Sequence, residues 1–276
     1  MSFIHLRARS AYSLLESMLH AKQLAKLAAA HGMPALGLTD SNNLYGALEF
    51  SEAAAEAGVQ PIIGCALKVR ADDLEGDIAV LVQNGEGYAR LLNLASAAHL
   101  DVSPQETPHV PLARLLAESD GLIALTGGLY GLVNAALDAG RPERAREIAE
   151  TLATTFSNRL YVELGRHGEP AEHEAEQGLI DIAYGLGLPL VAANDIRFKK
   201  KSDHRAHDAL LCIAASSYLG EEDRFKVSEE HYFKTAEEMS ALFDDLPEAI
   251  EHTTEIARRC AFRVAPRKPI LPQFTR

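Results

Sequence analysis

The stretch ALGLTDSNNLYG, residues 35–46, contains the start of a βα unit. The apolar run Ala35 to Thr39 predicts a buried strand, and the polar residues that begin at Asp40 predict its end. Residues 44–57 are rich in Ala, Leu and Glu, which favour helix, and Gly58 suits a left-handed helix cap. A strand, a polar loop and a helix in this order form the repeating unit of parallel βα folds.

The same alternation continues through the first two hundred residues. Residues 21–31 form another helical pattern, followed by a cap at Gly32. No G-x-G-x-x-G loop follows the first strand, which disfavours an open dinucleotide-binding sheet. We therefore predict an α/β fold, a distorted, closed or nearly closed (βα) barrel of seven mainly parallel strands. The candidate strands are Phe3 to Arg7, Ala35 to Thr39, Pro61 to Val69, Asp77 to Val82, Gly121 to Leu125, Leu160 to Leu164 and Leu190 to Ala193.

The last third of the chain has a different, mostly helical pattern. Thr235-x-x-Glu238 is a capping box that predicts a helix through Phe243. A second helix is expected after Pro247, with apolar residues at near-helical spacing. We predict a barrel over residues 1–200 and a helical extension packed on it over residues 201–276.

The composition indicates a globular domain. Of the 276 residues 47% are hydrophobic, and no apolar stretch is long enough to span a bilayer or to serve as a signal peptide, so we expect a cytoplasmic protein. The net charge of -12 argues against a main nucleic-acid clamp, which needs excess Lys and Arg. Cys65, Cys212 and Cys260 are odd in number and widely spaced, so we interpret them as free thiols, two of them buried.

Polar side chains with catalytic or metal-binding potential fall in or beside the strand-end loops. Glu16, Asp40, His167 and Asp195 are four such groups, and in parallel βα folds the ends of the strands meet at one rim. Loop Asp residues also cap helices and form Asx turns. Asp40, ahead of the helix at Leu44, is open to both interpretations.

Several strings resemble the motifs of one family in order along nearly the whole chain. FIHLRARSAYSLLE, residues 3–16, resembles the opening of the polymerase and histidinol phosphatase (PHP) domain, and residues 35–46 resemble its second motif. QPIIGC at 60–65, YVEL at 161–164 through His167-Gly168, and NDIRF at 194–198 with AHD at 206–208 resemble later motifs. FKTAEEM at 233–239 to LPQF at 271–274 resembles the junction into a polymerase core. The resemblance implies a barrel of PHP type.

The chain departs from the family pattern at the metal ligands. Active members carry a His-x-His pair in the first motif, where this chain has Arg7 and Arg9. They carry His after the Asp of the second motif, an acidic residue after Gly-Cys and His in the last motif, where this chain has Ser41, Ala66 and Arg197. A guanidinium is always protonated and has no lone pair for a metal. The resemblance thus implies a degenerate site with no catalytic residue and no metal.

Asp40, His167 and Asp195 are the residual candidates for a single metal ion. Without metal ions, Glu16, Asp40 and Asp195 would be crowded and unpaired, and we expect the arginines at 7, 9 and 197 to compensate their charge. The alternative is that these arginines reach solvent, as most arginines do.

The resemblance also implies a biological role. It is to the PHP domain at the N-terminus of bacterial replicative DNA polymerase III alpha subunits, a structural domain that docks the proofreading exonuclease (epsilon) subunit. Nucleotidyl transfer with Mg2+ and contacts with DNA and the sliding clamp would belong to the rest of the alpha chain, absent here, and no membrane contact is expected. The alternatives are an active metal-dependent phosphoesterase or proofreading nuclease, and the PHP domain of an error-prone polymerase paralogue.

Overall fold

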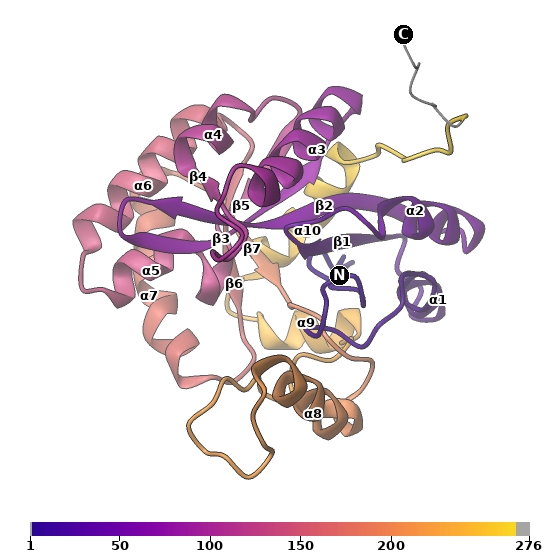
Figure 1. Ribbon diagram of the computed structural model, residues 1–276. Coiled ribbons are helices and arrows are strands. Elements are labelled where there is room, and N and C mark those ends of the chain that lie inside the picture. The colour runs from indigo at the N-terminus through magenta and orange to yellow at the C-terminus, as the bar shows by residue number, and fades with distance from the viewer. Residues whose placement is uncertain (1, 269–276) are drawn as a thin grey trace, which may run out of the picture.

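The computed structural model describes residues 2–268, and its centre is one curled, mixed sheet (Figure 1). The sheet order is β1-β2-β3-β5-β6-β7, and β4 pairs with β2. Six of the seven predicted strands are confirmed, whereas the short β4 has no counterpart in the prediction. The strands are β1 Ala35–Ser41, β2 Gln60–Ala71, β3 Leu74–Val82, β4 Val110–Pro111, β5 Leu122–Leu125, β6 Leu160–Gly165 and β7 Leu190–Ala193.

The seventh predicted strand, residues 3–7, is an extended segment without regular strand pairing, and it lies between the two edges of the sheet. On one side the N–H groups of Gly37 and Thr39 in β1 donate to the carbonyls of His5 and Ala8. On the other side the segment exchanges backbone hydrogen bonds with Ile196, just after β7. A Cβ at Gly37 would overlap the Leu6 carbonyl, so glycine permits this close approach. Residues 5–9, here called the closing segment, therefore link the first and last strands, as a barrel requires.

β3 departs from the mainly parallel arrangement of the other strands. It runs antiparallel to both β2 and β5, whereas the β1–β2, β5–β6 and β6–β7 pairs are parallel. β2 and β3 form a hairpin whose turn contains Asp72 at a φ of 53°, a conformation that Asp tolerates better than most residues. Because β3 runs backwards, its first residues lie beside the last residues of β2.

Helices cover the outside of the sheet (Figure 1). The predicted caps at Gly32 and Gly58 have φ values of 66° and 72°, and the capping box of Thr235 and Glu238 is present. The helices are α1 Ala21–Ala30, α2 Ala47–Glu56, α3 Gly85–Leu100, α4 Leu112–Ala117, α5 Leu132–Asp138, α6 Pro142–Thr155, α7 Pro170–Leu186, α8 His204–Ala215, α9 Ala236–Leu242 and α10 Pro247–Arg259, with 3-10 turns η1 Gly128–Tyr130 and η2 Lys201–Asp203.

The last helix, α10, packs against β7 and contributes to the interior. Its residues Ile256 and Ala257, and Cys260 just after its end, belong to one buried apolar cluster with Leu6 and Leu81 from the barrel. Cys65 and Cys212 are buried as well, and all three cysteines are unpaired. Helix α10 is therefore packed on the barrel. The boundary of the helical extension at residue 200 stays a prediction, and the motif at 271–274 lies outside the described residues.

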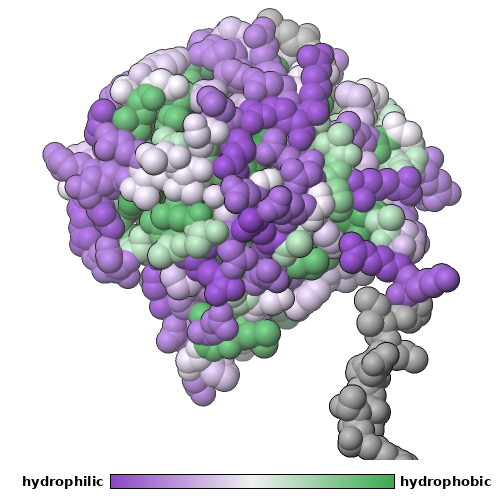
Figure 2. Space-filling view, turned by 90° about the horizontal axis from the view of Figure 1, so that it is seen from above, coloured by the Kyte–Doolittle hydropathy of each residue, from purple (hydrophilic) through white to green (hydrophobic). Residues whose placement is uncertain are grey.

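The surface is mixed in character. On the face seen in Figure 2, hydrophilic and hydrophobic side chains are interspersed. Between residues 2 and 268, none of the helices has the length and apolar character needed to cross a bilayer.

Candidate functional site

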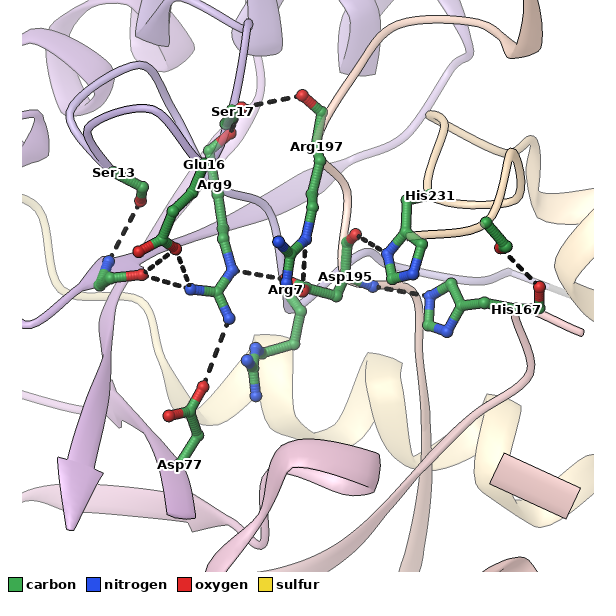
Figure 3. Close-up of polar contacts among 12 residues, drawn as sticks. Arg7, Arg9, Ser13, Glu16, Ser17, Asp77, His167, Asp195, Arg197 and His231 are labelled. Atoms are coloured by element: carbon green, nitrogen blue, oxygen red, sulfur yellow. Dashed lines mark hydrogen bonds and ion pairs between the residues drawn. The ribbon is translucent and has the colours of Figure 1, made fainter. Parts of the chain in front are cut away.

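The polar site lies where the closing segment, the loop after β1 and the residues after β7 come together (Figure 3). Arg9 comes from the closing segment, Glu16 from the loop that follows it, and Asp195 and Arg197 from the stretch after β7. Ala66 in β2 and Ser41 at the end of β1 line the same open pocket of about 470 Å³. The fold therefore brings together residues that are far apart in the sequence.

Arg9 is at the centre of this site and is 3% exposed. Its Nε donates to Asp195 Oδ1 at 2.8 Å, its Nη1 to Glu16 Oε2 at 2.8 Å, and its Nη2 is 3.4 Å from Asp77 Oδ2. Nη1 also donates to the hydroxyl of Ser41, which itself donates to Glu16 Oε2 at 2.6 Å. Burial alone would lower the pKa of Arg9, but the three carboxylates raise it well above its usual value.

Asp195 is shared by two arginines. Arg9 binds one carboxylate oxygen, and Arg197 binds the other through Nε at 3.1 Å and Nη2 at 2.9 Å. Burial of Asp195 raises its pKa, but Arg9 and Arg197 outweigh this effect and hold the pKa well below its usual range. The carboxylate is therefore ionised and fully engaged, and the alternative that Arg9 and Arg197 reach solvent is excluded by their 3% and 4% exposure.

Arg7 has a different partner from the one expected. Its Nη1 contacts both oxygens of Glu163 in β6, at 3.2 and 2.9 Å, and both residues are buried. Burial raises the pKa of Glu163 despite the opposing effect of Arg7. The sequence did not single out Glu163, although an acidic residue inside the apolar run of β6 is a usable signal.

Asp40 is buried at the end of β1 but has no arginine on its carboxylate. It accepts hydrogen bonds from the N–H and Oγ of Ser10 at 2.7 and 2.8 Å and from Ser13 Oγ at 2.6 Å. Burial raises its pKa, although these hydrogen bonds oppose the shift. The prediction that an arginine neutralises Asp40 by direct pairing is therefore wrong, because serine dipoles take that position.

Asp77 is a second residue that the sequence reading missed. It lies near the start of β3, 2.8 Å from Lys68 Nζ and 3.4 Å from Arg9 Nη2. Burial raises the pKa of Asp77, but the positive charges of Arg9 and Lys68 lower it by a larger amount, so the net shift of the pKa is downward. Only the antiparallel direction of β3 brings this strand start to the rim. The Asp72-Asp73 pair between two apolar runs was the hairpin signal that could have revealed it.

His167 is at the site, and both of its ring nitrogens are already engaged. Its Nε2 accepts from the backbone N–H of Asp195 at 3.2 Å, so Nδ1 carries the proton and donates to Glu172 at 2.5 Å. The His231 ring stacks on it with centroids 3.9 Å apart. Burial lowers the pKa of His231 to about 4, which keeps this second imidazole neutral at pH 7.

The arrangement does not fit a cluster of metal ions. Among residues 2–268, no three His, Cys, Asp or Glu side chains are grouped so that they could hold a metal. Guanidinium groups stand among the carboxylates instead, and a cation there repels a second cation. Asp40, His167 and Asp195, the residual candidates, are tied to serines, to Glu172 and to arginines respectively.

Comparison with known proteins identifies the family. The model of the PHP domain family matches residues 5–167, which is more than half of the chain. The chain belongs to the PHP domain family. The match begins at the closing segment and ends at His167, so it includes most of the rim residues described above.

Curated relatives of this PHP domain chain are polymerase subunits. It is 49% identical over 284 residues to the DNA polymerase III subunit alpha of Caulobacter vibrioides, and 37% identical over 277 residues to that of Escherichia coli. Each alignment covers 99% of the chain but only 24% of the relative, so the chain spans about a quarter of the length of these relatives.

Solved structures similar to this PHP domain chain are more distant. A putative metal-dependent phosphoesterase from Bifidobacterium adolescentis is 16% identical, with a TM-score of 0.46, over 70% of this chain and 86% of that one. An amidohydrolase from Chromobacterium violaceum is also 16% identical, with a TM-score of 0.49, over 71% and 88%. At this level of similarity the two structures say nothing about the chemistry of the chain.

Proposed function

We propose that this chain is the PHP domain of a DNA polymerase III alpha subunit and that it acts as a metal-free structural domain. The longer protein would be a DNA-directed DNA polymerase whose core, outside this chain, uses Mg2+ and contacts DNA and the sliding clamp. Within it, the PHP domain would support the core and dock the proofreading exonuclease subunit. The names of the relatives support the first part of the proposal.

The observation that carries the metal-free role is the Arg9–Asp195–Arg197 arrangement. Two arginines occupy both oxygens of the carboxylate that would otherwise be free to bind an ion. A metal ion would have to displace them, and Arg197 would then be buried without the carboxylate it pairs with, while Arg9 would keep only Glu16 and Asp77. Catalysis by an ion needs an open coordination position and a bound water, and this arrangement favours neither.

Elemental analysis tests the metal-free role directly. We expect the purified chain, incubated with Zn2+ and Mn2+ and then desalted, to retain less than one equivalent of either metal. It should also fail to hydrolyse a phosphomonoester under conditions in which an active PHP phosphoesterase, assayed in parallel, does so. Two or three equivalents of metal per chain, or metal-dependent turnover, would overturn this part of the proposal.

Docking of the exonuclease requires a separate test. The chain and its cognate exonuclease subunit should co-elute from a size-exclusion column, and the complex should survive treatment with a chelator because no metal bridges it. A complex that needs the polymerase core would fail to form with this chain alone and would overturn the docking role, while the metal analysis would still stand.

A further inference from the structure

Helix α8 has an inner face that is fully explained by the fold. His207, Leu211 and Cys212 are buried, and the His207 ring lies 5.1 Å from the ring of Phe198. His207 Nε2 also binds the backbone carbonyl of Glu16, which attaches the helix to the polar site. This face anchors α8 at the bottom of the molecule in Figure 1, below the barrel.

The opposite face of α8 is apolar as well. Ala206, Ala209, Leu210 and Ile213 follow the spacing i, i+3, i+4, i+7, which puts them on one stripe. Ala206 and Ile213 are exposed, Ile213 by 67%, and Ala209 and Leu210 are half-buried. We call these four residues the outer stripe. A surface helix normally has one apolar stripe, directed at the core, and polar residues opposite. A second apolar stripe that is partly open to solvent, beside exposed cations, suits a surface that another molecule covers.

A group of cations lies at the N-terminal end of the same helix. Lys199, Lys200 and Arg205, here called the basic cluster, are exposed, and none of them forms an ion pair with any residue in the range 2–268. Lys201 differs, since it pairs with Glu230. The positive end of a helix dipole disfavours cations, and the chain as a whole carries a net charge of -12. The placement therefore costs stability unless an anionic group meets it.

We propose that the outer stripe and the basic cluster together dock an acidic amphipathic helix of a protein partner. The apolar side of such a helix would cover Ile213 and its neighbours, and its carboxylates would meet the basic cluster. A nucleic acid would satisfy the cations but leave the aliphatic stripe exposed, so the combination favours a protein. The inference does not depend on the partner being the exonuclease.

A designed peptide serves as the probe, and the 276-residue chain is the receptor. The acidic peptide has Leu at i, i+3, i+4 and i+7 and Glu at most other positions, and a matched basic peptide has Lys in place of Glu. By fluorescence anisotropy, the acidic peptide should bind saturably and more weakly as salt rises, because screening weakens the charge contacts. Equal binding of both peptides, or no binding of the acidic one, would overturn the proposal.

Variants locate the surface. Ile213→Asp and the double change Lys199→Glu with Lys200→Glu should each weaken binding of the acidic peptide about tenfold. Leu100→Asp, at a residue of α3 that is 79% exposed, and Lys22→Glu with Lys26→Glu on α1 are matched controls and should leave binding unchanged. The changed residues are exposed, so the variants should fold, and thermal melts would verify this.

Two further measurements separate the other occupants. A single-stranded oligonucleotide that binds more tightly than the acidic peptide, with no effect of Ile213→Asp, would overturn the proposal in favour of a nucleic acid. Sedimentation would detect a second copy of the chain. Self-association that Ile213→Asp abolishes would assign the outer stripe to a dimer and would also overturn it.

Discussion

Asp195 and Asp40 are both buried acids near Arg9, and they are held in opposite ways. Asp195 is clamped by Arg9 and Arg197, and its pKa lies well below the usual range. Asp40 is held by the dipoles of Ser10 and Ser13, and its pKa is raised. Direct ion pairing between an arginine and a buried aspartate is therefore found at Asp195 and not at Asp40.

The two arrangements have different energetic consequences. On the arginine side, removing one charge leaves its buried partners with less compensation, and this can cost more than the pair itself contributes. On the serine side the donors are neutral, and hydrogen bonds from neutral donors stabilise a carboxylate less than ion pairs do. Substitutions on the two sides should therefore differ both in size and in pH dependence.

Arg9→Ala should have the largest effect because Arg9 serves three carboxylates. We expect the free energy of unfolding to fall by roughly 3–5 kcal/mol at neutral pH. Urea melts measure the change, and Arg146→Ala, which removes a surface pair with Glu150, is the control at roughly 0–1 kcal/mol. A loss below about 1 kcal/mol for Arg9→Ala would show that its ion pairs contribute no more than exposed ones, and it would contradict the prediction.

Asp195→Asn tests the arginine side by pH. The folded pKa of Asp195 is lowered, so its ionised form stabilises the fold at neutral pH, and this contribution is lost as the pH falls below about 4, where the unfolded chain takes up protons first. The variant should thus be less stable than the wild type at pH 7, and the difference should shrink in acid. Stability curves that stay parallel from pH 7 to pH 3 would contradict the pairing.

Arg197→Ala should have a smaller effect than Arg9→Ala. Asp195 keeps Arg9 in this variant, so the change removes hydrogen bonds to a charged group and does not strand the carboxylate. We expect a loss of roughly 1.5–3 kcal/mol in urea melts. A loss equal to that of Arg9→Ala would mean that the two arginines contribute equally to stability. It would contradict the larger contribution expected of Arg9 from its three carboxylate partners.

Asp40→Asn should have the smallest effect of the four, about 1 kcal/mol at neutral pH. The sign of its pH dependence should be opposite to that of Asp195. Because the folded pKa of Asp40 is raised, the wild type takes up a proton in the folded state first and gains stability relative to the variant as the pH falls toward about 4. Calorimetric melts of both proteins between pH 7 and pH 4 measure this, and a gain by the variant instead would refute the serine-side account.

The sequence predicted the arginine side of the site better than the serine side. Arg9, Asp195 and Arg197 stand at motif positions, and like charges at one rim must be compensated, so their pairing followed from charge balance. Ser10 was part of a quoted motif, but nothing in its pattern says that its hydroxyl and N–H point at Asp40. A hydrogen bond from a neutral donor leaves no charge imbalance for a reader of the sequence to detect.

The fold was predictable where strands and helices alternate and less so where the direction changes. The antiparallel course of β3 was missed, and with it Asp77, because an apolar run has the same appearance in either direction. His231 was missed for another reason. It reaches Asp195 from a loop that carries no regular pattern, and only the tertiary structure places its ring on His167.

The closing segment at residues 5–9 has a consequence for the order of folding. Its backbone partners lie in β1 and at Ile196, and Arg9 meets Asp195 across 186 residues of sequence. Contacts of such long range pay a large loop-closure entropy before they contribute stability. In a chain synthesised from its N-terminus, Arg7 and Arg9 emerge well before the stretch after β7, and they stay hydrated until that stretch has emerged. A segment that is made before the rest of the barrel thus becomes one of the last to fold, and the polar site forms only when the whole barrel is complete.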